Sequence, residues 1–140
     1  MKPMKHPYAV PGRLPADLER VYAYWKGLLR GSAQIPFWDD ARLTDLPDLA
    51  GRLFLVDAFQ RPERFRFGTV GEDLPADLSG LFLDEVEPPT PFEFLLSQAS
   101  ATVEAQAPTY VRAEDGYARL LLPMWGDGRI SMLLGAVDPG

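Results

Sequence analysis

The chain has 140 residues, of which 46% are hydrophobic and 11% aromatic, and its formal net charge is −6. This length and composition are typical of one folded domain that buries its own core. The acidic balance argues against a nucleic-acid-binding protein, which usually has a basic surface. The lack of cysteine excludes disulfides, thiolate metal sites and cysteine nucleophiles, and it favours a cytoplasmic location.

The N-terminal residues 1–13 contain Pro3, Pro7 and Pro11 and no apolar periodicity. We predict that they form an extended arm, ordered only if it docks on another surface. The arm lacks the apolar core of a signal peptide, and no apolar run in the chain is long enough to span a membrane. Residues 14–140 are predicted to form a single domain.

A helix is predicted from Pro15 to Arg30, with Gly31 ending it. Its apolar residues recur at helical spacing, so they form a stripe along one face. The stripe packs either on the domain itself or on a second copy of the chain, and we expect a homodimer. The candidate interface residues are Leu18, Val21, Tyr22, Trp25 and Leu29.

Two strands follow, at Arg52–Phe59 and Arg64–Val70, joined by a turn that contains Pro62. The second strand alternates between Phe65 or Phe67 on one face and arginine on the other. Such alternation is typical of a strand with one buried face. The first hairpin is therefore expected to have an aromatic core face and a partly wet outer face.

The next segment, Gly71 to Pro91, is rich in proline and carboxylates, with short helical turns expected near Leu74–Leu78 and Phe82–Glu85. A longer helix is predicted from Thr90 or Pro91 to about Gln106, before Pro108. Its apolar stripe is Phe92, Leu95, Leu96, Ala99, Thr102 and Val103.

Three strands close the chain, at Thr109–Ala113, Tyr117–Trp125 and Ile130–Val137, with a turn at Gly126–Gly128. The last two are apolar at nearly every position, which predicts a central hairpin that is covered on both faces. Two strands, a helical crossover and three strands indicate an α+β fold with a five-stranded antiparallel sheet.

From about Val21 to Val137 the chain resembles a PAS domain of one bacterial branch, the short single-domain proteins found mainly in alphaproteobacteria. The resemblance rests on an ordered set of segments. They are Tyr24-Trp25 with Leu29-Arg30-Gly31, Pro36, Leu53 to Asp57, Arg64 to Phe67, Gly71, Leu78 to Gly80, Leu120 to Pro123, and Asp127-Gly128. Trp38 and Gly68 stand where that branch usually has arginines, so a role of those arginines is not expected here.

The resemblance implies a PAS-like sheet with an N-terminal helix and a helical crossover between strands 2 and 3. It also implies a sensory or signal-relay role without catalysis, acting through a small ligand or a protein partner. Because the sequence ends at Gly140 without an output domain, we expect the signal to pass to another protein. The alternative is a ligand-free dimerisation or adaptor module.

The cofactor expectations follow from the same resemblance. Without cysteine, a flavin–cysteine adduct and a thioester-linked chromophore are excluded. Haem ligation is disfavoured because the only histidine, His6, lies in the N-terminal arm. Non-covalent flavin stays open, but no residue argues for it.

Six aromatic residues either line a ligand pocket between the sheet and the crossover helices or simply fill the core, and we favour the core. They are Phe54, Phe65, Phe67, Phe92, Tyr110 and Trp125.

Other candidate sites are weaker. The acidic crossover residues form either a cation site or, as we favour, a solvated loop. We therefore predict no metal site. Ser97 and Ser100 have no histidine partner in the domain, so no catalytic residue is predicted. The acidic residues are Asp77, Asp84, Glu85, Glu87 and Glu93.

Overall fold

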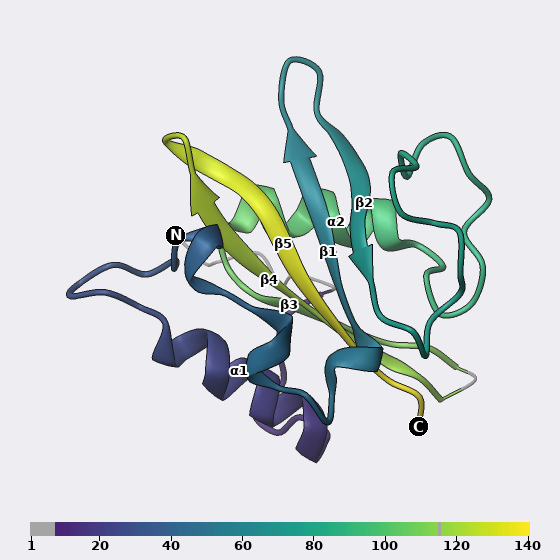
Figure 1. The fold of residues 1–140 in the computed structure, drawn as a ribbon, viewed down its shortest axis with the longest axis horizontal. Coiled ribbons are helices and arrows are strands. Elements are labelled where there is room, and N and C mark those ends of the chain that lie inside the picture. The colour runs from purple at the N-terminus through teal and green to yellow at the C-terminus, as the bar shows by residue number, and fades with distance from the viewer. Residues whose placement is uncertain (1–7, 115) are drawn as a thin grey trace, which may run out of the picture.

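A computed structural model describes residues 8–114 and 116–140. It confirms the α+β class and the five-stranded antiparallel sheet, whose strand order is β2-β1-β5-β4-β3 (Figure 1). Every predicted strand is present, with its ends shifted by one residue at most. The strands are β1 Leu53–Phe59, β2 Arg64–Val70, β3 Thr109–Arg112, β4 Ala118–Gly126 and β5 Arg129–Asp138.

The last hairpin lies at the centre of the sheet, as predicted, with β5 between β1 and β4. Asp127 and Gly128 connect its strands with φ angles of 54° and 77°. Two successive residues with positive φ are typical of a tight hairpin turn that matches the twist of its strands. The strands of this hairpin are buried over nearly their whole length.

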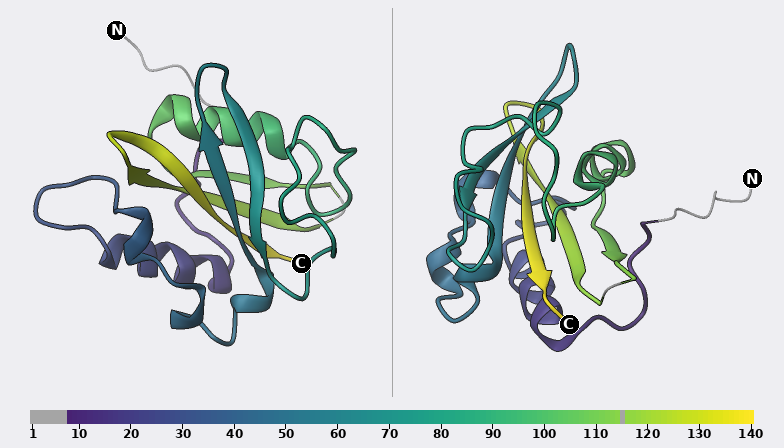
Figure 2. Two further views of the ribbon diagram at one scale, coloured as in Figure 1. Left: turned by 45° about the horizontal axis from the view of Figure 1, so that its top comes forward. Right: turned by 90° about the vertical axis from the view of Figure 1, so that its right-hand side faces the viewer.

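The two helices cover opposite faces of the sheet (Figure 2). Successive side chains of a strand point to opposite faces, so Leu120 of β4 packs with α1 and Leu121 packs with α2. Both faces of the central hairpin are therefore covered, as its apolar sequence predicts. Within the described residues, α1 and α2 both fall short of the length and apolarity that a membrane-spanning helix needs.

Helix α1 spans Ala16–Gly27, so the prediction that it reaches Arg30 is wrong at its C-terminal end. The amide of Leu28 donates to the carbonyl of Trp25, and that of Leu29 to Lys26. Each of these bonds joins residues three apart, whereas α-helical bonds join residues four apart. The α-helix therefore ends in a tighter turn around Gly27.

Helix α2 spans Leu95–Ala105 and begins later than predicted, because Phe94 has a left-handed φ of 61°. Phe92 therefore precedes the helix, although it is fully buried, and Leu96 of the predicted stripe is 44% exposed. No helix is present in the crossover of the described residues, where Phe82 to Glu85 forms a single turn closed by the bond from the Glu85 amide to Phe82 O at 3.0 Å. Three short helical turns lie instead before β1. These are η1 Trp38–Asp40, η2 Leu43–Asp45 and η3 Ala50–Arg52.

Candidate functional site

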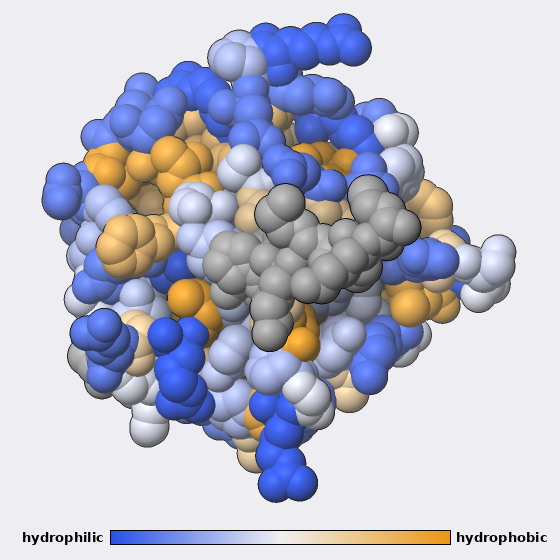
Figure 3. Space-filling model, turned by 180° about the vertical axis from the view of Figure 1, so that it is seen from behind, coloured by the Kyte–Doolittle hydropathy of each residue, from blue (hydrophilic) through white to orange (hydrophobic). Residues whose placement is uncertain are grey.

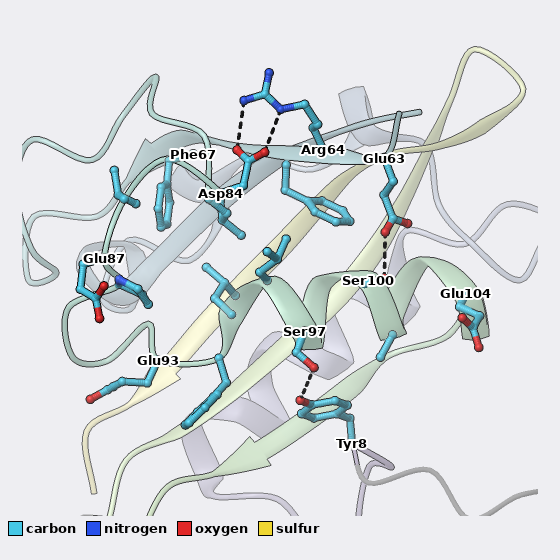
Figure 4. A pocket seen from close by; sticks show the side chains of 18 residues that line it. Tyr8, Glu63, Arg64, Phe67, Asp84, Glu87, Glu93, Ser97, Ser100 and Glu104 are labelled. Atoms are coloured by element: carbon cyan, nitrogen blue, oxygen red, sulfur yellow. Dashed lines mark hydrogen bonds and ion pairs between the residues drawn. The ribbon is translucent and has the colours of Figure 1, made fainter. Parts of the chain in front are cut away.

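An open groove of about 940 Å³ lies between β2, the crossover and α2. Figure 3 shows hydrophobic side chains in a hollow at the upper left of this side of the molecule, bordered by hydrophilic ones. Figure 4 shows the groove from close by. Its apolar lining residues are Phe65, Phe67, Leu83, Val86, Pro88, Phe94, Leu95, Leu96 and Ala101.

The groove exists because the crossover pairs with the free edge of β2. The amide of Phe67 donates to Leu81 O at 2.9 Å, and the amide of Leu83 donates to Phe65 O at 2.8 Å. An exposed strand edge otherwise presents unpaired backbone groups, so this pairing protects it. It also sets the residues from Leu83 onward opposite α2, and the groove lies between them.

Polar contacts lie along the sides of the groove (Figure 4). Arg64 makes a bidentate contact with Asp84 at 3.1 and 3.0 Å, and this hydrogen bonding lowers the pKa of the Asp84 carboxyl. Ser100 on α2 donates to Glu63 at 2.8 Å, while the Tyr8 hydroxyl donates to Ser97 at 2.8 Å. Side chains from β2, the crossover, α2 and the N-terminal arm therefore meet around one recess.

Arg119, a fully buried residue of β4, holds the segment that precedes α2 and forms one wall of the groove. Its Nη1 donates to Pro91 O at 2.7 Å, its Nη2 to Glu93 O at 3.0 Å, and its Nε to Gln98 Oε1 at 2.7 Å. Burial lowers the pKa of the guanidinium, although an arginine stays charged at neutral pH. Because Arg119 binds these two carbonyls, it favours the non-helical segment before α2.

Gln98 extends this contact into a buried polar network on α2 and β3. Gln98 Nε2 donates to Thr109 Oγ1 at 3.1 Å, and the Thr102 and Thr109 hydroxyls lie 2.6 Å apart. Buried polar groups that satisfy one another rigidify a core. The sequence analysis missed Arg119, although a single cation inside an apolar strand was a usable signal.

Glu93 is a groove carboxylate that two hydroxyls hold. Thr90 donates to it at 2.6 Å and Tyr117 at 2.8 Å, and these hydrogen bonds lower the pKa of Glu93. Burial raises the pKa of the Tyr117 phenol, and the hydrogen bond to Glu93 raises it further. Glu93 is therefore anionic at neutral pH.

The predicted aromatic pocket is divided by the sheet. Phe54, Phe65, Phe67 and Phe92 are all buried in the α2-side cluster, and Trp125 packs beside them. Tyr110 pairs with Leu120 across β3 and β4, and residues paired in this way share a face. Tyr110 thus lies on the α1 side, away from the other five.

The buried aromatics pack closely against one another. The ring centroid of Phe92 is 5.0 Å from that of Phe54 and 5.1 Å from that of Phe67. A Cβ atom at Gly135 would overlap the Phe54 ring. Only Phe65 and Phe67 of the six predicted residues line the groove.

The predicted interface stripe faces the sheet of its own chain. Leu18, Val21 and Trp25 are buried there, and the Trp25 indole donates to Pro123 O at 2.8 Å. Tyr22 and Leu29 are half-buried.

The acidic crossover does not assemble a cation site in the described residues. Asp84 and Glu85 pair with Arg64, at 3.0 and 3.3 Å, and Asp77 is exposed. His6 lies outside the described residues. Trp38 is half-exposed, and its ring lies against Gly126.

Comparison of the chain with protein-family models, with curated proteins and with solved structures gives no significant match.

Proposed function

We propose that the protein is a cytoplasmic PAS-like sensory or signal-relay module that binds a small ligand or a protein segment in the groove between β2 and α2. The observation that carries this proposal is the groove itself, about 940 Å³ with an apolar floor and polar sides. Ligand sites are usually recesses of this size with apolar walls and a few polar groups. The element order, with a helical crossover between β2 and β3, supports the PAS-like class.

The proposed mechanism follows from the structural elements that form the groove. Its wall at Glu93 and Phe94 belongs to the segment that Arg119 ties to β4, and its floor belongs to β2 and α2. A bound ligand that shifts this segment would also change the Arg119 contacts and, through β4, the sheet face that carries α1. Binding would then be relayed to a partner protein by repacking.

A pair of tryptophan variants on α2 tests this site. Ala101 lines the groove and Ala105 is exposed outside it, so Ala101→Trp fills the recess and Ala105→Trp controls for the added ring. We expect native mass spectrometry or thermal shift against metabolites and peptides to reveal a ligand for wild type and Ala105→Trp. Binding should be lost in Ala101→Trp. No ligand by either method, or equal binding by both variants, would contradict the proposal.

The close packing of Phe92 against Phe54 and Phe67 favours a second candidate, a ligand-free dimerisation or adaptor module. The expected homodimer stays a prediction. Since Leu18 and Trp25 face the sheet of their own chain, a dimer through these residues needs the helix to be exchanged between two chains. Light scattering distinguishes a mass of 15.6 kDa from twice that value.

A further inference from the structure

The charges around the groove have one dominant sign. Among the described residues that line it, five are carboxylates and one, Arg64, is a guanidinium already engaged by Asp84 and Glu85. The unbalanced charge of the groove is therefore negative. The lining carboxylates are Glu63, Asp84, Glu87, Glu93 and Glu104.

The carboxylates between the two ends of the groove are engaged by other side chains, since Ser100 donates to Glu63 and Arg64 pairs with Asp84. Figure 4 shows Glu87 and Glu93 at one end and Glu104 at the other, beyond Ser100. Glu87 and Glu104 are both exposed, and within residues 8–114 and 116–140 neither carboxylate has a hydrogen-bond or ion-pair partner. Two carboxylates are thus available to a cationic group from outside.

Between these ends, exposed apolar side chains adjoin the Glu63–Ser100 and Tyr8–Ser97 contacts. Leu95 forms part of the floor, and at the lip Phe94 is 76% exposed and Leu96 44% exposed. A large apolar side chain left in water next to a recess indicates an interaction surface when it adjoins other apolar residues. The groove therefore presents acidic side chains at both ends and exposed apolar side chains between them.

We propose that this groove docks a basic amphipathic segment of a partner protein, with a lysine or arginine at each end and apolar side chains between them. This inference rests on the proposed groove-binding function and names its partner class. The 11 residues of α2 span about 16 Å, a distance that about five extended residues cover. An open groove of this length suits a chain segment, whereas a small ligand is usually enclosed over most of its surface.

The inference is tested by calorimetry with two blocked hexapeptides, Lys-Ser-Leu-Phe-Ser-Lys and Glu-Ser-Leu-Phe-Ser-Glu. The lysine peptide should bind wild-type protein at least about tenfold more tightly at low ionic strength. The preference should shrink in about 0.5 M salt, because salt screens exposed charges. Ala101→Trp should abolish binding of the lysine peptide.

Two double variants separate the groove from the overall acidity of the chain. Glu87→Gln with Glu104→Gln should weaken the lysine peptide at least about threefold. Glu72→Gln with Glu114→Gln removes the same charge from exposed positions outside the groove and should leave its affinity unchanged.

Three other outcomes would contradict the inference, and each would do so in a different way. Equal binding of both peptides, abolished by Ala101→Trp, would overturn the charge preference while leaving the groove as a binding site. A small cation retained in native mass spectrometry and lost in Ala101→Trp, without peptide binding, would replace the protein segment by a small molecule. Absence of any peptide or ligand binding to wild type would overturn both this inference and the proposed function.

Discussion

Replacing Arg119 by methionine tests whether the buried guanidinium holds the groove wall. Methionine keeps an unbranched apolar stem but donates no hydrogen bond. The change leaves Pro91 O, Glu93 O and Gln98 Oε1 without their donors at 2.7, 3.0 and 2.7 Å.

The expected cost is a balance of two opposing effects. Each buried acceptor left unpaired costs about 1–3 kcal/mol. Removing a desolvated cation recovers several kcal/mol. We therefore expect Arg119→Met to lower the free energy of unfolding by about 3 kcal/mol, a large part of the roughly 5–15 kcal/mol typical of a domain. Urea denaturation measures this change, and hydrogen exchange should be faster in residues 90–95.

Two further variants make the result interpretable. Arg112→Met changes an exposed arginine on β3 and should alter stability by no more than about 0.5 kcal/mol. Combining Arg119→Met with Gln98→Leu should cost less than the two single changes together, because they share one hydrogen bond. An Arg119→Met protein as stable as wild type, with unchanged exchange at 90–95, would refute the proposed role of the network.

Three other predictions concern the groove rim, α1 and the core. Hydrogen bonds lower the folded-state pKa of Glu93, so its contribution to stability is present above its unfolded pKa of 4.5 and is lost as pH falls. Glu93→Gln should therefore flatten the fall in melting temperature between pH 5 and 3, and parallel curves would count against this. Trp25→Phe removes the bond to Pro123 O and should cost about 1–3 kcal/mol in urea; no loss would mean that this bond contributes little. Gly135→Ala overpacks the Phe54 ring and should cost about 1–3 kcal/mol, whereas a neutral effect would reveal free space in the aromatic core.

The strands could be predicted from the sequence because their pattern is local. Phe65 and Phe67 alternate with arginines, and the apolar runs around Gly126–Gly128 have the length and turn of a hairpin. The helix ends were less predictable. Arg119 is far along the chain from the start of α2, yet it binds the carbonyls of Pro91 and Glu93 that a longer helix would use.

The groove could not be derived from the sequence. Its wall depends on the pairing of residues around Leu81 and Leu83 with β2, and that segment has no periodicity of its own. Tyr110 was grouped with the other aromatics because its face depends on the β3–β4 register, which a four-residue strand specifies weakly. The preference for a filled core agrees with the packing of Phe92, although the groove beside it was not foreseen.

The central claim is that ligands bind in the groove between β2 and α2 rather than in the aromatic core. Amide NMR mapping with a neutral apolar probe, indole, tests it most directly. We expect the largest shift changes at Ser97, Ser100 and Ala101, which line the groove, and none at Gly135, which abuts Phe54 in the core. Changes confined to Gly135 and its neighbours on β4 and β5, with an unperturbed α2, would contradict the claim.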